Sequence, residues 1–410
     1  MKSFLLFLAL LFFIPLAHAQ QSFTLSGTVK DKRGEPLPGT GVYVSDYKIA
    51  TATDDKGNYV LRLKPGNYNI LAQLMGYKAS NKNIIISEKP AVLNFILEES
   101  STQLSDVTIK PDPNRLAYLN TFKTHFIGLT ENAQKCKMLN SDVLRFDFDK
   151  EKSTLTAQSD DFLIIENKAL GYNIKYLIKE FKYDYKAGIV FYEGYPTYED
   201  LPGSENKHKK WAKKRLDAYN GSAQHFFTAL FNNTSRQEGF SINKLIKNQV
   251  EEDLADSIVQ SQASGLTSRT LTLPGAVNYS APKKTVQPVT TGPIRSNHHT
   301  NTLNRAEIDP DTLVHQYNAD IKKINFTNVL YVIYEKEKES SLYKSKITMS
   351  VSRPPDLANT QISLINLKIP PVYFYKNGGI FNPRSMLYQG YWAWEKIADS
   401  VPLDYKPGQN

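Results

Sequence analysis

One stretch of the chain brings together side chains that could bind an anion or transfer a proton. Trp211, Arg215 and Tyr219 are spaced four residues apart, which places them on one stripe of a helix. Ser222 and His225 follow across a short turn. Arginine, tyrosine, serine and histidine are the residue types of an anion site or of an acid–base set, so this group is a candidate functional patch.

The same five residues also have a structural interpretation, which we favour. Trp211 and Tyr219 would be core anchors, Ser222 would cap a helix, and the stem of Arg215 would pack between the two rings. Arg215 would then need a carboxylate, and the acids nearby in the sequence are Asp217, Glu238, Glu251 and Glu252. A hydrolase that uses Arg215, Tyr219 and His225 remains the alternative.

Other catalytic and metal-binding patterns are missing from the sequence. The histidines form no H-E-x-x-H or H-x-x-E motif, and neither a G-x-S-x-G elbow nor a P-loop occurs. The lone Cys136 excludes an intramolecular disulfide and a cysteine-based zinc cluster. The sequence predicts no metal and no cofactor, and it favours a protein that is not an enzyme.

Aromatic residues are dense near the C-terminus. If they are exposed they could stack on sugar rings, which gives a second alternative, a glycan-binding surface protein. If they are buried they form a core, which their spacing along one strand and one helix favours. The residues concerned are Tyr373, Phe374, Tyr375, Phe381, Tyr388, Tyr391, Trp392 and Trp394.

The elements that would carry these residues belong to an α+β domain over 114–405 with an antiparallel sheet. Helical spacing predicts helices over 115–127, 204–219 and 222–231, and a further helix over 392–401. Apolar alternation predicts strands over 143–148, 155–158, 162–166, 172–181, 189–193, 324–335, 343–351 and 361–367.

A change of composition interrupts this domain. Residues 258–306 contain no aspartate or glutamate and are rich in Ser, Thr, Asn, Gln, Gly and Pro. Such a segment buries too little apolar surface to offset the entropy lost on ordering. We therefore predict a disordered insertion over 258–312.

The N-terminal part of the chain has a different pattern. Short apolar strands alternate with turns over 22–100, and a proline-containing linker over 101–113 follows. Strands at this spacing are typical of a β-sandwich. The fold class expected for the whole chain is therefore multidomain, with an all-β sandwich followed by the α+β domain.

Residues 22–98 resemble the carboxypeptidase regulatory-like family. The resemblance rests on Ser26-Gly27-Thr28-Val29, Gly34-Glu35-Pro36-Leu37-Pro38-Gly39, Thr53-Asp54-Asp55-Lys56-Gly57-Asn58-Tyr59 and Pro65-Gly66-Asn67-Tyr68. It implies a transthyretin-like sandwich without catalytic residues of its own. The family's module occurs beside zinc carboxypeptidases and at the front of outer-membrane receptors of Bacteroidota. The resemblance thus implies an exported protein of the Bacteroidota type.

The first 19 residues resemble a signal peptide. Lys2 precedes an apolar run from Phe4 to Ala17, and Ala17-His18-Ala19 fits a cleavage site before Gln20. We expect export to the periplasm, the outer-membrane surface or the medium, and no membrane span in the mature chain.

The charge of the chain also bears on its partners. The formal net charge is +9, and the lysines and arginines cluster only between His208 and Arg215. For an exported protein this favours an anionic glycan or surface over nucleic acid. We therefore expect a non-enzymatic envelope protein with a sandwich that docks or stabilises, and an α+β domain that binds an unknown partner, either an envelope protein or a glycan.

Overall fold

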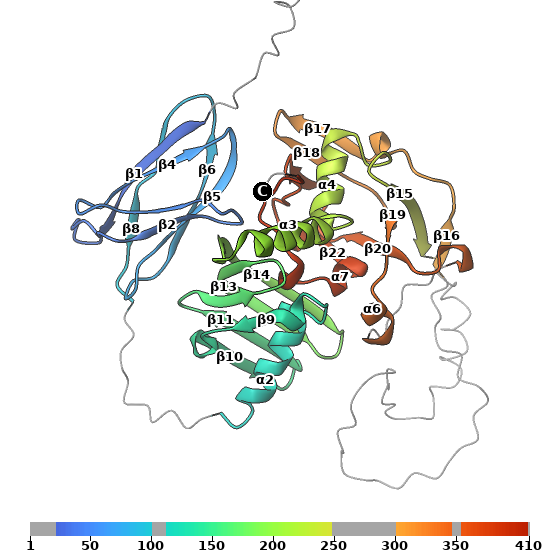
Figure 1. The fold of residues 1–410 in the computed structure, drawn as a ribbon, viewed down its shortest axis with the longest axis horizontal. Helices are drawn as coiled ribbons and strands as arrows, with labels where there is room; N and C mark the ends of the chain where they lie inside the picture. The colour runs from blue at the N-terminus through green and yellow to red at the C-terminus, as the bar shows by residue number, and fades with distance from the viewer. Residues whose placement is uncertain (1–21, 101–111, 248–300, 347–353, 409–410) are drawn as a thin grey trace, which may run out of the picture. The chain divides into compact units, whose positions relative to one another are not determined.

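The computed structural model describes residues 22–100, 112–247, 301–346 and 354–408 (Figure 1). The expected signal peptide, most of the expected linker and the insertion up to residue 300 lie outside the described residues. The chain forms two compact units, Met1–Lys110 with Tyr195–Tyr198, and Pro111–Gly194 with Glu199–Asn410. Each unit has a hydrophobic core of its own.

The first unit is built from two four-stranded sheets. One has the order β4-β1-β7 with β8 paired to β1, and the other has the order β3-β2-β5-β6. The strands are β1 (Phe23–Asp31), β2 (Gly41–Val44), β3 (Ala50–Ala52), β4 (Asn58–Leu63), β5 (Gly66–Gln73), β6 (Ser80–Ile86), β7 (Ala91–Val92) and β8 (Phe95–Leu97).

The alternation seen in the sequence sets the core of this sandwich. Tyr59, Leu61 and Leu63 of β4 are buried while their neighbours are exposed, as a period of two requires. Gly27 lies so close to the link between β7 and β8 that a Cβ there would sit 1.9 Å from the carbonyl oxygen of Leu93. The predicted sandwich is therefore confirmed, and the glycine of the Ser-Gly-Thr-Val segment is explained by close backbone approach.

The described residues of the second unit form three antiparallel sheets. Their orders are β10-β11-β13-β12-β9 with β14 on β13, then β16-β15-β19-β20-β22, and β17-β18-β21. The strands are β9 (Cys136–Met138), β10 (Leu144–Asp149), β11 (Thr154–Ser159), β12 (Leu163–Asn167), β13 (Tyr172–Asp184), β14 (Ile189–Asp200), β15 (Phe240–Lys247), β16 (Asn301–Asn304), β17 (Val314–Asn318), β18 (Ile321–Ile324), β19 (Val329–Lys338), β20 (Thr360–Leu367), β21 (Val372–Tyr375) and β22 (Met386–Gly390).

Five α-helices accompany these sheets in the described part of the unit. They are α2 (Arg115–Phe122), which continues as a π-helix over Lys123–Ile127, α3 (Glu205–Tyr219), α4 (Ala223–Asn232), α6 (Ser341–Lys346) and α7 (Tyr391–Trp394). The helices expected over 115–127, 204–219 and 222–231 are confirmed.

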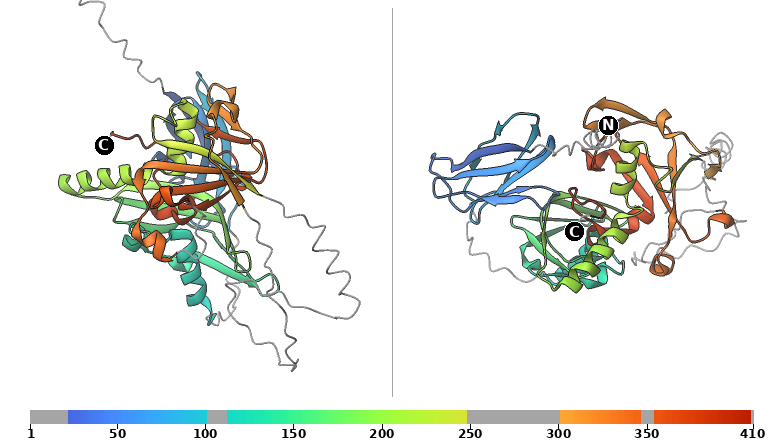
Figure 2. Two further views of the ribbon diagram at one scale, coloured as in Figure 1. Left: turned by 90° about the vertical axis from the view of Figure 1, so that its right-hand side faces the viewer. Right: turned by 45° about the horizontal axis from the view of Figure 1, so that its top comes forward.

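Helix α4, the yellow-green helix beside the orange strands in Figure 2, contributes four buried residues to the core of the second unit. Its buried Phe226 and Phe227 pack against Phe240 of β15 and Phe374 of β21, so one helix joins two sheets. The opposite face of the five-stranded sheet is also buried, through residues such as Tyr331. The α+β fold class with antiparallel sheets is therefore confirmed.

Part of the expected disordered insertion is ordered. Residues 301–304 form β16, which pairs with β15, and Leu303 packs on the core of that sheet. Pro310–Thr312 form a 3-10 turn that the side chain of Asp309 caps. The prediction of disorder was wrong for 301–312, because backbone and capping hydrogen bonds compensate for the polar composition of this segment.

Three predicted elements differ from the structure. The strand expected over 324–335 is interrupted, because β18 ends at Ile324 and β19 begins at Val329. A strand was expected over 343–351, but the described part of this segment belongs to α6, which ends at Lys346. Just before this helix, the Ser340 hydroxyl accepts a hydrogen bond from the backbone N–H of Leu342. The helix expected over 392–401 ends at Trp394, and a 3-10 turn follows over Ile397–Asp399. The carboxylate of Asp399 bonds to Thr130, a contact that helical spacing alone cannot reveal.

Candidate functional site

Trp211 and Arg215 both hold the loop between β12 and β13. The indole Nε1 of Trp211 donates to the carbonyl oxygen of Lys168 over 3.1 Å. The guanidinium of Arg215 donates from Nε to Leu170 O over 2.7 Å and from Nη2 to Gly171 O over 3.0 Å. The first half of the predicted patch therefore fixes a loop backbone to α3.

Arg215 also has a carboxylate partner and an aromatic partner. Its Nη2 lies 2.8 Å from Oδ1 of Asp200, at the end of β14, and its guanidinium carbon lies 3.8 Å from the ring centroid of Tyr172. The expected partners Asp217 and Glu238 pair elsewhere, and Glu251 and Glu252 lie outside the described residues. The packing of its stem between Trp211 and Tyr219 stays a prediction.

Tyr219, Ser222 and His225 form a second, separate group at the junction of α3 and α4. The Ser222 hydroxyl caps α4 by accepting from the backbone N–H of His225 over 3.1 Å. The rings of Tyr219 and His225 lie 4.9 Å apart, and burial raises the pKa of Tyr219. The structure thus divides the five predicted residues into two clusters.

His225 has both ring nitrogens engaged. The backbone N–H of Gly221 donates to Nδ1 over 3.0 Å, and Nε2 lies 2.6 Å from Oε2 of Glu238. Burial lowers the pKa of His225, and the Glu238 carboxylate opposes this only in part. A neutral imidazole held from both sides has the geometry of a structural linker, with no nitrogen left for a substrate.

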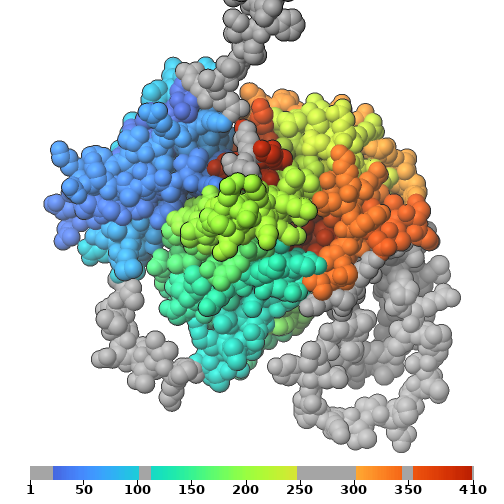
Figure 3. Space-filling view, in the orientation of Figure 1, coloured from blue at the N-terminus to red at the C-terminus, as the bar shows by residue number. Residues whose placement is uncertain are grey.

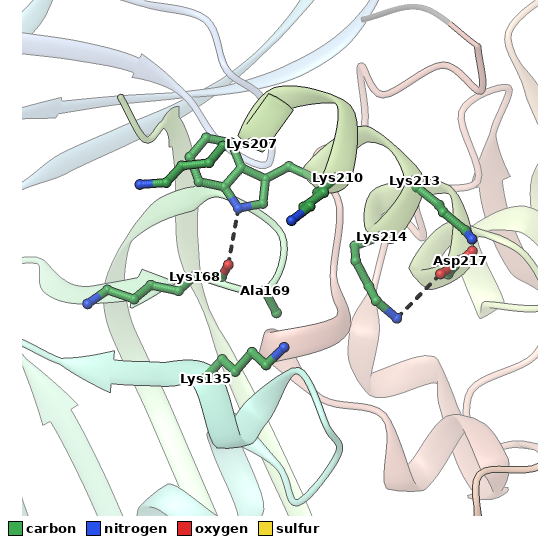
Figure 4. A pocket seen from close by; sticks show the side chains of 9 residues that line it. Lys135, Lys168, Ala169, Lys207, Lys210, Lys213, Lys214 and Asp217 are labelled. Carbon is green, nitrogen blue, oxygen red and sulfur yellow. Dashed lines mark hydrogen bonds and ion pairs between the residues drawn. The ribbon is translucent and has the colours of Figure 1, made fainter. Parts of the chain in front are cut away.

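A basic cleft lies along the exposed side of α3. It has a volume of about 370 Å³, and Figure 4 shows its side chains from close by. Helix α3 lies on the face turned toward the viewer in Figure 3. The lining residues are Lys135, Lys168, Ala169, Lys207, Lys210, Trp211, Lys213, Lys214 and Asp217.

The wall opposite α3 is positioned by backbone hydrogen bonds. The N–H of Lys168 donates to the carbonyl oxygen of Lys135 over 3.2 Å, and Lys168 O accepts from Trp211. Gly171 has a φ of +72°, and a Cβ there would lie 2.2 Å from Cδ2 of Trp211. The tight turn and the flat indole together set the distance between the two walls.

Charge in the cleft is strongly unbalanced. Six lysines and a single aspartate line it. Lys214 pairs with Asp217 over 3.4 Å, and Lys168 pairs with Glu166 over 3.1 Å. Such an arrangement attracts anions, because the positive groups share a concave surface with little negative charge to oppose them.

Sequence reasoning located only part of this cleft. The lysines of α3 belong to the basic cluster visible between His208 and Arg215, apart from Lys207 just before it. Lys135 and Lys168 carry no signal in the sequence, because they reach the cleft only through the pairing of two distant backbone segments. Trp211 was predicted, and it serves the cleft as a fixed support for Lys168.

Half of the eight C-terminal aromatic residues are buried, and Tyr388 packs against the core of the second unit. Phe374, Tyr391, Trp392 and Trp394 are buried, while Phe381 is 63% exposed. Among the described residues no group of three or more His, Cys, Asp or Glu side chains is arranged to hold a metal ion. No helix in the described ranges is long and apolar enough to cross a membrane.

The N-terminal unit has a defined family. Residues 25–109 match the family model of the CarboxypepD_reg-like domain. This module of the chain is therefore a CarboxypepD_reg-like domain, as its strands and turns indicated. The match begins within β1, covers the rest of the sandwich and ends within the expected linker.

Two curated proteins are similar to part of the chain. Structural protein 27 of a virus (isolate Australia/Victoria) is 30% identical over 115 residues, which are 27% of this chain and 22% of that protein. The TonB-dependent receptor SusC of Bacteroides thetaiotaomicron is 32% identical over 124 residues, which are 27% of this chain and 12% of the receptor. The chain thus spans less than a quarter of either relative.

Two solved structures are also similar in part. A DUF3823 family protein from Bacteroides ovatus is 11% identical with a TM-score of 0.17, over 45% of this chain and 83% of that chain. The C-terminal domain of the Caf1A usher is 19% identical with a TM-score of 0.16, over 18% of this chain and 97% of that chain. At TM-scores this low, neither similarity bears on function.

Proposed function

We propose that this is an exported, non-enzymatic envelope protein that binds an anionic ligand in the cleft along α3. The sandwich serves as a docking or stability module, and residues 114–405 form one binding domain. The binding role rests on the composition of the cleft, which is lined by six lysines and a single aspartate.

The envelope assignment is supported by the N-terminal part of the chain. The CarboxypepD_reg-like module and the partial similarity to SusC point to a Bacteroidota-type envelope protein. The apolar run from Phe4 to Ala17 and the site at Ala17-His18-Ala19 support export with Gln20 as the new N-terminus. N-terminal sequencing of the exported protein tests this; a first residue of Met1 would contradict it.

The hydrogen bonds of Arg215 and His225 support a binding role over a catalytic one, because both side chains are already held by other groups of the protein. Arg215 is occupied by two carbonyls and Asp200, and His225 is occupied by Gly221 and Glu238. These groups stabilise the walls and the helix junction. The cleft itself offers ammonium groups, which attract negative charge but are not a nucleophile activated by a base.

The test compares a charged and a neutral probe of the same backbone. We expect dextran sulfate to bind the wild-type protein in isothermal titration calorimetry, and dextran to give no signal. The double variant Lys207→Gln/Lys210→Gln should bind dextran sulfate roughly tenfold more weakly, since each exposed ion pair contributes up to about 1 kcal/mol. Affinity should fall as salt is raised.

A matched control separates the cleft from the overall charge. Lys209 of α3 pairs with Glu205, Lys152 pairs with Asp149, and neither lines the cleft. The variant Lys152→Gln/Lys209→Gln removes the same charge and should retain wild-type affinity. Equal losses in both double variants would contradict a site in the cleft, as would equal binding of dextran and dextran sulfate.

A further inference from the structure

The lysines of α3 form a ladder along the cleft. Lys207, Lys210 and Lys214 follow the spacing i, i+3, i+7, which places them on one helix face. At a rise of 1.5 Å per residue the ladder is about 10 Å long. Lys135 and Lys168 stand on the facing wall, as Figure 4 shows. The positive charge is therefore extended along a line rather than gathered around one point.

Each lysine of this ladder binds an anion only weakly by itself. The lysines that line the cleft are exposed, and the side chain of Lys214 keeps 53% of its surface in contact with solvent. An ion pair at such a hydrated position contributes about 0–1 kcal/mol. A small anion that reaches one or two ammonium groups is held weakly, whereas a chain of anions adds several contacts at once.

The other lining groups favour sugars over phosphate polymers. Asp217 accepts hydrogen bonds, which a sugar hydroxyl can donate, and it repels a densely charged phosphate chain. Arginine, whose planar fork suits bidentate binding of phosphate, is not among the residues that line the cleft. The backbone positions of these lysines advance by about 5 Å per step along the helix axis, a spacing that suits a polymer with one carboxylate on each ring.

We infer that the ligand of the α3 cleft is an acidic polysaccharide that carries a carboxylate on successive sugar rings. This inference rests on the proposed function, since it specifies the ligand of the same site. The chain lies along Lys207, Lys210 and Lys214, its carboxylates face the ammonium groups of both walls, and its hydroxyls reach Asp217 at one end.

The experiment measures how affinity depends on the length and the charge of the probe. Galacturonate oligomers of one, three and six rings are titrated into the full mature protein by calorimetry. We expect no measurable binding of the monomer, at least about tenfold tighter binding of the trimer, which already spans the three lysines of α3, and little further gain for the hexamer. Methyl esterification removes the charge and keeps the backbone, so the esterified hexamer should not bind.

Each further outcome separates this inference from the proposed function. If dextran sulfate binds through Lys207 and Lys210 but the galacturonate hexamer does not, the cleft binds anions and the inference about uronate is overturned. The same holds if the monomer equals the hexamer, or if linear polyphosphate binds more tightly at equal charge. If neither dextran sulfate nor the hexamer responds to Lys207→Gln/Lys210→Gln, the proposed function fails as well.

Discussion

The imidazole of His225 donates from Nε2 to the carboxylate of Glu238 over 2.6 Å, in the tautomer that the backbone of Gly221 selects. Because Nδ1 accepts the Gly221 N–H, the ring proton must reside on Nε2 in the neutral form. Glu238 also accepts from the hydroxyl of Thr234. The turn before α4 and the turn after it are thereby joined through one side chain.

Replacing His225 tests this link. His225→Phe keeps a ring but removes both hydrogen bonds, and it should cost about 2–3 kcal/mol at pH 7.5. Because the folded pKa of His225 lies below its ordinary 6.5, the wild type loses stability as pH falls below about 6.5. The gap between wild type and variant should narrow as the pH is lowered toward 5 in urea titrations. A constant or widening gap would disprove a neutral buried histidine.

Arg215 should be important for stability rather than for ligand contact. Its side chain is 14% exposed and holds two carbonyls and Asp200, so Arg215→Ala should cost about 3 kcal/mol. Arg215→Lys should restore little of this, because an ammonium cannot reproduce the planar fork. Lys209→Ala on the same helix is the control. Thermal melting at or above the wild-type temperature for Arg215→Ala would refute the structural role.

Gly171 should be the most sensitive backbone position of the cleft. Both Gly171 and Gly188 have positive φ, at +72° and +64°, but a Cβ at Gly171 would collide with Trp211 whereas nothing lies within 4 Å at Gly188. Gly188→Ala should cost about 1–2 kcal/mol from backbone strain alone. Gly171→Ala should cost distinctly more and should weaken dextran sulfate binding. Equal melting temperatures for the two variants would contradict this account.

Asp399 should give the opposite pH dependence to His225. Burial raises the pKa of Asp399 to about 6, against an ordinary 3.8, although Thr130 and Asn132 donate to it. The folded state therefore binds a proton that the unfolded state releases, and stability falls as pH rises from about 4 to 6. Asp399→Asn keeps one acceptor and should remove this fall, while the exposed Asp142→Asn should retain it. Parallel stability curves for wild type and Asp399→Asn would contradict the burial argument.

The sandwich should fold without the second unit. Its core is formed from residues between Leu25 and Leu97, and eight strands in two sheets enclose it. A fragment of residues 22–100 is therefore expected to unfold cooperatively when followed by circular dichroism. A broad unfolding transition without a folded-state baseline would show that the sandwich depends on the rest of the chain.

Local sequence patterns were enough to predict most helices and strands, whereas some of their ends depend on tertiary contacts. Apolar spacing and the cap at Ser222 were enough to predict α3 and α4, since both signals lie in or next to the helices. The end of α7 could not be predicted, because the bonds from Thr130 and Asn132 to Asp399 compete with continued helix.

Tertiary contacts also explain why the sequence predicted only the α3 side of the candidate site. Trp211 and Arg215 were marked by helical spacing, but their partners Lys168 and Asp200 lie on strands or loops that the sequence cannot place beside α3. Lys135 reaches the cleft only through its carbonyl bond to Lys168. The residue types of α3 were enough to identify one wall of the cleft as basic. The other wall depends on the backbone hydrogen bond between Lys168 and Lys135, which the sequence does not reveal.

The pairing of β15 with β16 has a consequence for protein engineering. Lys247 and Asn301 are direct register partners in this antiparallel ladder, so the chain leaves the sheet and re-enters it at adjacent points. A two-residue hairpin turn spans such a gap. A connection as short as two residues can therefore join Lys247 to Asn301 with the pairing of β15 and β16 intact. This junction is a place where a purification tag, a fluorophore or a new chain terminus can be introduced.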